Sequence, residues 1–441
     1  ARTARGAFAD RDTRSARFVI VLARLFGDVE ACRDLEAAAM AAVTEEIGRL
    51  VTAEGAVVLT GSIAVVERVA RWAGIRAVMR RLAGRTWDDE TDGRWRAAAA
   101  FAMRLLGTRG LALGGRNARP GVARGLLEEL EASGGGRARR TVRLLRRAAR
   151  SPEFRRARGS VLRADLHDPT SATAVIRTGW EGDAVRVLLE YRDAVPRLEI
   201  ACGDRLLAAG SWDWEISPPR QGGQAEGGWK ASAWESDRRA SFLEIVAPLG
   251  GGMLLERQVV VLRRPRIVLL ADAVIPATGA DAGSIGYRAA VPLAPGLEAE
   301  AAAETRELVV YDGAMRFMAL PLALPEWRTA GHGLLVADAG SLVLDVAGHR
   351  RLYAPLWLDF EPRRVGRPLT WRQLTVADTR RNLPPHQAAG SRVQVGREQW
   401  LLYRSLDTVR NRTVLGCNVS SGFLLGRVKR SGEVARTVEI E

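Results

Sequence analysis

Cysteine is scarce in this sequence, and long apolar runs are missing. The three cysteines lie far apart, form no CxxC motif and cannot all pair with one another (Cys32, Cys202 and Cys417). A disulfide-built fold is therefore not expected, and each cysteine is interpreted as a small buried side chain. No apolar run approaches the ~18 residues of a membrane-spanning helix, and the first ten residues lack the apolar segment of a signal peptide. We expect a soluble protein with no signal peptide in the given chain, and its compartment stays open.

Histidine is equally scarce, with four residues in the chain: His167, His332, His349 and His386. No two of them are four residues apart, and neither an HExxH motif nor a Cys/His cluster occurs. Glycine-rich phosphate loops and a nucleophile elbow are also missing. The sequence therefore predicts no metal and no cofactor. Isolated histidines of this kind are usually structural or exposed.

Lysine is almost absent, so the net charge of +15 is an arginine charge. Residues 1–160 hold 31 arginines against 18 acidic residues, and the rest of the chain is nearly neutral. The densest segment, residues 137–158, has ten arginines and one acid. On a helix, one face would carry the candidate ligand-binding residues Arg139, Arg143, Arg146, Arg147 and Arg150. The abundance of alanine and arginine is also typical of a GC-rich bacterial genome.

Arginine side chains bind phosphate, sulfate and carboxylate through paired hydrogen bonds. The arginine-rich segment therefore suggests contact with an acidic polysaccharide or another polyanion. A nucleic acid is less favoured, because no nucleic-acid-binding motif accompanies the charge. The alternative is a solvated helix that joins two domains and binds nothing.

The hydrophobic pattern changes period near Gly159. Before it, a period near 3.6 predicts helices at 29–53, 62–83, 94–107, 120–132 and 138–150, with an acidic loop at 87–93. After it, alternation with period two and frequent Gly, Pro and Asp turns predict many strands. We therefore expect an α+β multidomain protein, with an Arg-rich α-helical domain over 1–158 and a β domain over 160–441. The strand that carries Trp212 and Trp214 on one face could stack on sugar rings, or the two rings could belong to the core.

Three segments resemble the heparinase II/III-like polysaccharide lyases. Residues 174–180 (AVIRTGW) are similar to a family strand AVLRS-x-W. Residues 234–237 (WESD), 255–259 (LERQV) and 267–274 (IVLLADAV) resemble later strands that end R-x-V…VVDRV. The resemblance covers about residues 160–290. It implies a partial α/α toroid-like region followed by a large antiparallel β-sandwich, and a uronate polysaccharide as the substrate class.

The chain departs from that family where the family carries its histidines. Residues 191–200 (YRDAVPRLEI) contain one Asp and no His, and residues 1–160 contain no Tyr or His and a single Asn, Asn117. β-Elimination needs a tunable base and an acid, and arginine is a poor base. We therefore expect a catalytically degenerate member that binds or organises acidic polysaccharide. The alternatives are a nucleic-acid-binding protein and an active lyase with a rearranged site, whose candidate catalytic residues are Tyr191, Arg192, Asp193, His332 and His349.

Overall fold

The computed structural model describes residues 15–84, 86–107, 122–146, 161–217, 221–222, 225–277, 283–329, 331, 333–379 and 381–441. The chain is an α+β protein in which helices precede antiparallel sheets. It forms two compact units. The N-terminal unit comprises residues 1–188 and 203–206, and the C-terminal unit comprises residues 189–202 and 207–441.

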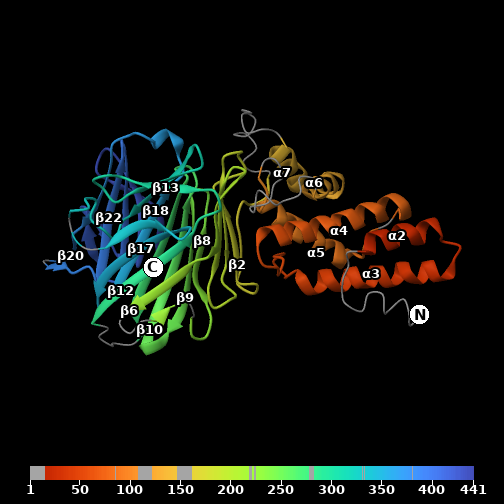
Figure 1. The fold of residues 1–441 in the computed structure, drawn as a ribbon, viewed down its shortest axis with the longest axis horizontal. Helices are drawn as coiled ribbons and strands as arrows, with labels where there is room; N and C mark the ends of the chain where they lie inside the picture. Colours follow the sequence, from red (N-terminus) through yellow and green to blue (C-terminus); the bar gives the residue numbers. More distant parts are fainter. Residues whose placement is uncertain are drawn as a thin grey trace. The chain divides into compact units, whose positions relative to one another are not determined.

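The N-terminal unit is built on helices (Figure 1). They are α2 (Ala16–Leu25), α3 (Glu30–Leu50), α4 (Ser62–Ala83), α5 (Asp89–Arg104), α6 (Val122–Ser133) and α7 (Gly136–Arg146). Helix α4 packs against α2, α5 and α6, and α7 packs against α6. No described helix is long and apolar enough to cross a membrane.

The acidic segment at 87–93 begins helix α5 instead of forming a loop. Asp88 is the N-cap residue, and its carboxylate accepts hydrogen bonds from the backbone N–H and the hydroxyl of Thr91. Asp89, Glu90 and Asp92 occupy the first turn, where the positive end of the helix dipole favours negative charge. The acidic residues therefore start the helix.

A five-stranded sheet has the order β1-β2-β3-β4-β5. Its strands are β1 (Leu166–Asp168), β2 (Thr173–Arg177), β3 (Val185–Glu190), β4 (Arg197–Cys202) and β5 (Arg205–Ser211). Strands β1 and β2 belong to the N-terminal unit and β4 to the C-terminal unit, while the division of the chain runs through β3 and β5.

The C-terminal unit contains an eight-stranded antiparallel sheet in the order β13-β14-β15-β18-β11-β10-β9-β8. Its strands are β8 (Lys230–Ser236), β9 (Ala240–Leu249), β10 (Met253–Leu262), β11 (Ile267–Pro276), β13 (Glu298–Ala301), β14 (Leu308–Tyr311), β15 (Met315–Pro321) and β18 (Leu352–Asp359). Short 3₁₀ turns, η4 (Gly250–Gly252) and η5 (Pro362–Arg364), follow β9 and β18.

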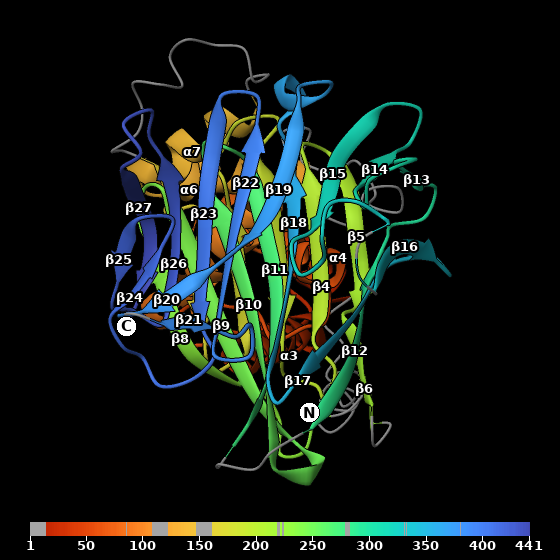
Figure 2. The ribbon, with the colours of Figure 1, turned by 90° about the vertical axis from the view of Figure 1, so that its left-hand side faces the viewer.

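Three smaller antiparallel sheets complete this unit (Figure 2). The first has the order β16-β17-β12-β6-β7, with β6 (Asp213–Ser217), β7 (Gln221–Gly222), β12 (Ser284–Pro292), β16 (Leu334–Asp338) and β17 (Ser341–His349). The second has the order β19-β22-β23-β26-β27, with β19 (Leu369–Leu374), β22 (Ala388–Val395), β23 (Glu398–Ser405), β26 (Phe423–Val428) and β27 (Val434–Ile440). The third has the order β21-β20-β24-β25, with β20 (Val376–Asp378), β21 (Arg381–Leu383), β24 (Arg412–Val414) and β25 (Cys417–Val419).

The main core of this unit lies between the eight-stranded sheet and the sheet that contains β23. Phe242 packs on Phe423 with ring centroids 4.9 Å apart, and Trp357 packs on Trp400 at 5.6 Å. The opposite face of β23 and β26 forms a second core with the sheet that contains β20. The central strands β23 and β26 therefore contribute side chains to a core on each face.

Strands β16 and β17 are joined by a tight turn. Ala339 and Gly340 both have positive φ, at 46° and 75°, and they join β16 to β17. Two successive residues of this conformation make the hairpin turn whose twist matches that of paired strands.

Candidate functional site

Helix α7 presents a row of exposed arginines in the N-terminal unit. The opposite face buries Thr141, Val142 and Leu145. The exposed face carries Arg137, Arg139, Arg140, Arg143 and Arg146. Glu131 is the acid that pairs with this row, bonding Arg146 and lying 3.9 Å from Arg143. The face therefore holds an excess of guanidinium groups over carboxylates. Of the five predicted ligand-binding arginines, Arg147 and Arg150 lie outside the described residues.

Residue Arg177, in the segment AVIRTGW, closes the C-terminal end of helix α5. Its Nη1 donates to the carbonyl oxygens of Arg104 and Leu106, each at 2.9 Å. Its guanidinium also stacks on the Trp180 ring, 4.3 Å from the centroid. The last carbonyls of a helix have no partner within the helix, and a cation there also complements the helix dipole. Arg177 therefore caps the C-terminal end of α5.

Two more buried arginines surround this helix end. Arg186 donates to the carbonyl oxygens of Leu105 and Gly203, and Arg104 donates to that of Arg163. Burial lowers the pKa of Arg104 to about 10, which Asp165 opposes. Burial, followed by repulsion from Arg186, lowers the pKa of Arg177. These arginines are enclosed, so they stabilise the fold and are not available to a polyanion.

The segments LERQV and IVLLADAV lie on neighbouring paired strands of the C-terminal unit, and a buried ion pair joins them. Arg257 on β10 lies opposite Asp272 on β11 in the strand register. Arg257 Nε donates to Asp272 Oδ1 at 2.8 Å and Nη2 to Oδ2 at 3.2 Å, while the Tyr287 hydroxyl donates to Oδ2 at 2.5 Å. Burial and the adjacent Asp272 raise the pKa of Tyr287 far above its ordinary value, so it remains a neutral donor.

The tryptophans proposed as sugar-stacking residues lie in the interior. Trp212 is 2% exposed and Trp214 is 4% exposed. The Arg257 guanidinium lies 4.0 Å from the centroid of the Trp212 ring, and its Nη1 donates to the Trp212 carbonyl oxygen. The structure therefore places both rings in the core, which is the alternative weighed for them.

The candidate catalytic segment at 191–193 follows strand β3 directly. Tyr191 is 2% exposed, whereas Arg192 and Asp193 are exposed. Every residue of β3 is buried, and Tyr191 extends this buried run by one residue. The tyrosine and the arginine are thus separated by their burial, and the hydroxyl of Tyr191 lies in the interior.

The structure pairs His349 with a histidine that sequence spacing did not connect to it. The rings of His349 and His386 lie edge to face, with centroids 6.1 Å apart. Burial, then Arg350, His349 and Arg351 in that order, lowers the pKa of His386, and Asp407 opposes them. His386 is consequently neutral near pH 7 and could accept a proton. His332 lies outside the described residues.

A second polar cluster links the eight-stranded sheet to strand β23. Arg404 bonds Glu256 and lies 3.0 Å from Glu244, and Gln258 donates to Glu244 at 2.7 Å. The Tyr353 hydroxyl donates to Gln258 Oε1 at 2.9 Å. Burial raises the pKa of Glu256, and Arg404 opposes this shift. The sequence showed no sign of this cluster, because its members come from four strands.

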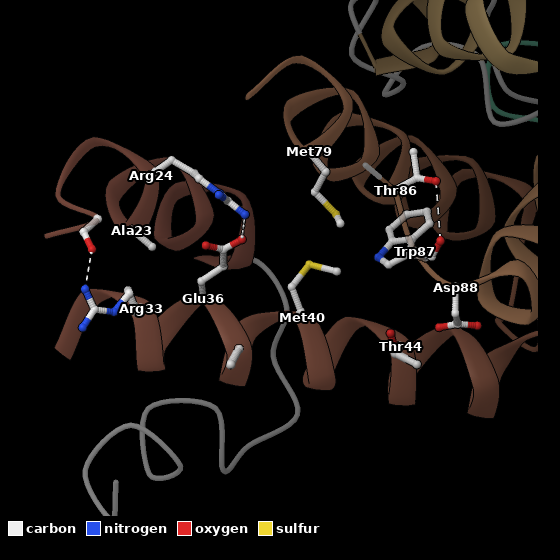
Figure 3. Close-up of a pocket in the computed structure, with 12 residues that line it drawn as sticks. Ala23, Arg24, Arg33, Glu36, Met40, Thr44, Met79, Thr86, Trp87 and Asp88 are labelled. Atoms are coloured by element: carbon white, nitrogen blue, oxygen red, sulfur yellow. Dashed lines mark hydrogen bonds and ion pairs between the residues drawn. The ribbon is translucent and has the colours of Figure 1, made fainter. Parts of the chain in front are cut away.

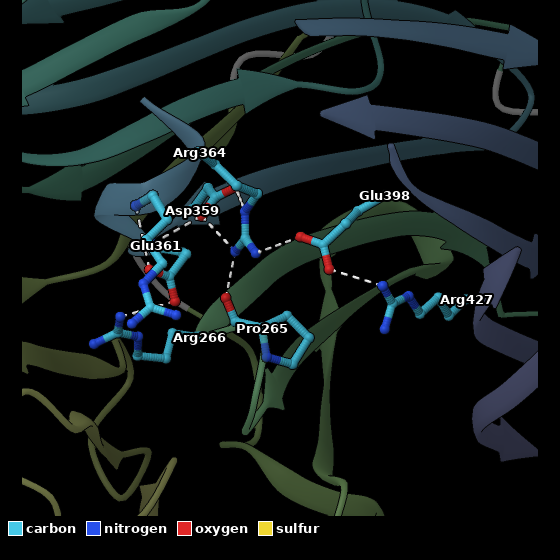
Figure 4. Close-up of polar contacts among 8 residues, drawn as sticks. Pro265, Arg266, Asp359, Glu361, Arg364, Glu398 and Arg427 are labelled. Atoms are coloured by element: carbon cyan, nitrogen blue, oxygen red, sulfur yellow. Dashed lines mark hydrogen bonds and ion pairs between the residues drawn. The ribbon is translucent and has the colours of Figure 1, made fainter. Parts of the chain in front are cut away.

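A third polar cluster, drawn in Figure 4, fixes the turn η5. Arg364 binds both carboxylate oxygens of Asp359, at 2.6 and 2.7 Å, and lies 3.2 Å from Glu398. Glu398 in turn accepts from Arg427 at 2.8 Å. Every charge in this cluster is paired, so it is structural. Within the described ranges, no group of three or more His, Cys, Asp or Glu residues is placed to hold a metal ion.

Comparison with solved structures identifies heparan sulfate lyases as structural neighbours. The heparan sulfate lyase HepC from Pedobacter heparinus matches with a TM-score of 0.60 and 10% identity, over 89% of this chain and 66% of HepC. A heparinase III, the BT4657 gene product, gives 0.62 and 9%, over 89% and 65%. Another heparinase III gives 0.57 and 11%, over 89% and 67%.

The chain spans about two thirds of the length of these enzymes, and identities this low show a shared fold alone. No protein-family model matches the sequence, and no curated protein sequence matches it. The relationship is therefore a distant one at the level of the fold.

Proposed function

We propose that the protein is a heparinase II/III-like protein that binds or organises acidic polysaccharide and does not cleave it. The observation that carries the proposal is the exposed arginine row of α7, which Glu131 offsets only in part. Guanidinium groups match the planar geometry of carboxylates and the oxygens of sulfates. The structural neighbour HepC is a heparan sulfate lyase, which favours a polyanionic polysaccharide over a nucleic acid.

We further infer the finer architecture from the same evidence. Residues 1–158 would form a partial α/α toroid-like domain, and residues 160–441 a large β-sandwich. The support for the toroid is the succession of helices α2 to α7, and the support for the sandwich is the core shared by two facing sheets. The proposed boundary at 158–160 lies outside the described residues.

The lack of cleavage follows from the chemistry of β-elimination. A lyase must neutralise the uronate carboxylate, remove the C5 proton and protonate the leaving oxygen, and arginine can perform only the first task. Residues 1–160 contain neither tyrosine nor histidine. Tyr191, the candidate base, has its ring in the interior at 2% exposure. General acid and base groups contribute about 10²–10⁴-fold each, so losing both would leave no useful rate.

One observation favours an active lyase as the second candidate. His349 is exposed and lies beside His386, a neutral imidazole of this pair could act as the base, and Arg350 and Arg351 could neutralise a carboxylate. The rearranged site would then lie at the turn between β17 and β18. The candidates Tyr191, Arg192, Asp193 and His332 would have no role in that site.

The two candidates are distinguished by one incubation. Purified protein is mixed with heparan sulfate, heparin, chondroitin sulfate or alginate, and the absorbance of unsaturated uronate is followed while bound glycan is measured by co-sedimentation. The proposal predicts bound glycan and no rise in absorbance. A rise that His349→Asn and His386→Asn abolish would establish the lyase instead. Binding of duplex DNA with no binding of any glycan would favour the nucleic-acid alternative.

A further inference from the structure

The N-terminal unit contains a pocket of about 550 Å³ that the arginine face does not use. Its lining comes from α2, α3, the end of α4 and the segment that leads into α5 (Figure 3). A volume of this size is typical of a small-molecule site. The middle of the pocket is apolar, because Met40 and Met79 face it together with the small residues Ala23 and Ala37.

One polar group of the pocket lining is the indole N–H of Trp87. Trp87 is 6% exposed, and its Nε1 donor is buried with no hydrogen-bond partner among the described residues. Figure 3 shows this nitrogen turned toward Met40 and Met79, into the pocket. Leaving a buried N–H without an acceptor costs free energy. Other described tryptophans share this state (Trp95, Trp212, Trp214 and Trp357), but Trp87 is the one of them that lines the pocket. The hydroxyls of Thr44 and Thr86 belong to the same lining.

The charged groups around the pocket already have partners. Arg24 donates to Glu36 at 2.6 Å, and Arg33 donates to the Gly27 carbonyl oxygen at 2.9 Å. Asp88 accepts from Thr91 at the start of α5. A charged ligand would have to compete with these bonds and would meet both signs of charge. A neutral ligand would leave them intact.

We propose that this pocket binds an uncharged, mainly apolar small molecule that carries an oxygen acceptor, such as a ketone or an ester. The apolar body contacts the polarisable side chains of Met40 and Met79, which adapt to varied shapes. The oxygen accepts the hydrogen bond that Trp87 Nε1 now lacks. The site is distinct in chemistry from the arginine face of α7, so it does not rest on the proposed polysaccharide binding.

The probes are cyclohexanone and methylenecyclohexane, which have nearly the same shape. Only cyclohexanone has an oxygen that can accept a hydrogen bond. Each is titrated into protein labelled with ¹⁵N on its indole nitrogens, and the Trp87 indole signal is assigned from its loss in Trp87→Phe. Trp72 is the internal control, because its Nε1 already donates to Glu46 Oε2 at 2.8 Å. We expect saturable movement of the Trp87 signal, an unmoved Trp72 signal, and binding of the ketone about fivefold tighter than that of the alkene.

Two variants test the assignment. Trp87→Phe should bind both probes alike, since it keeps an aromatic side chain and removes the N–H donor. Ala37→Met adds volume at an exposed position of the lining and should weaken both probes at least fivefold. An unchanged Trp72 signal verifies that each variant is folded. Equal affinity for ketone and alkene in the wild type, no movement of Trp87, or unaltered binding in Ala37→Met would overturn the proposal.

Discussion

Arg257 and Asp272 lie directly opposite each other on β10 and β11 and form a bidentate ion pair. Both side chains are buried. A shift of the register by one residue would turn either side chain to the opposite face of the sheet, away from its partner. The pair therefore fixes the alignment of two central strands.

Removing the charge of Asp272 is expected to destabilise the C-terminal unit strongly. Asp272→Asn leaves the Arg257 guanidinium buried without a counter-charge, which typically costs about 3–5 kcal/mol of unfolding free energy. Asp338→Asn is the matched control, because Asp338 pairs with Arg288 on the surface at 3.2 Å and such pairs contribute about 0–1 kcal/mol. Denaturant unfolding followed by tryptophan fluorescence measures both. Equal, small losses in the two variants would show that the buried pair does not hold the strands.

Loss of Arg404 is expected to make stability depend on pH. Arg404→Met leaves Glu244 and Glu256 facing each other near Gln258 without their shared cation. The pKa of Glu256 is already raised by burial, and repulsion would raise it further. A carboxyl with a raised folded-state pKa contributes stability below its unfolded pKa and loses it as the pH rises through the folded pKa.

The stability deficit of Arg404→Met should therefore be large at pH 7 and shrink as the pH falls toward 4.5. Thermal unfolding of wild type and variant across pH 4.5–8 measures this. Arg397→Met removes an exposed arginine of the same unit and should show no such trend. A deficit of the same size at every pH would contradict the repulsion described here.

Replacing Arg177 should loosen the end of helix α5. Arg177→Met removes the donor shared by the carbonyl oxygens of Arg104 and Leu106, and each buried acceptor left unpaired costs about 1–3 kcal/mol. Hydrogen exchange should therefore quicken at the last turn of α5. The control is Arg124→Met on α6, whose side chain is 80% exposed. Unchanged protection of that turn would show that Arg177 does not cap the helix.

The sequence predicted the two longest described helices closely. Predicted helices at 29–53 and 62–83 are observed at Glu30–Leu50 and Ser62–Ala83. Helix α2 was not predicted. Its apolar residues surround the helix, so that Ile20 is buried while Phe18 is 67% exposed.

The candidate sites were less predictable than the elements, because they depend on contacts between distant strands. His349 and His386 are brought together by two separate turns. The alternation of apolar and polar residues along a strand places Trp212 on one face. It does not show whether that face contacts a sugar or the core, because the pattern is the same in both cases. The arginine row of α7 could be predicted because it depends only on helical spacing within one segment.

The salt dependence of heparan sulfate binding tests the proposed function most directly. Each neutralised anionic group adds about −0.7 to −0.9 to the slope of log affinity against log salt. The triple variant Arg139→Gln, Arg143→Gln, Arg146→Gln should therefore bind more weakly and with a slope flatter by about two units. The control variant Arg397→Gln, Arg410→Gln, Arg430→Gln removes the same charge from exposed positions of the C-terminal unit and should keep the wild-type slope. Identical affinity and slope in the α7 variant and the wild type would contradict the assignment of this face to polyanion binding.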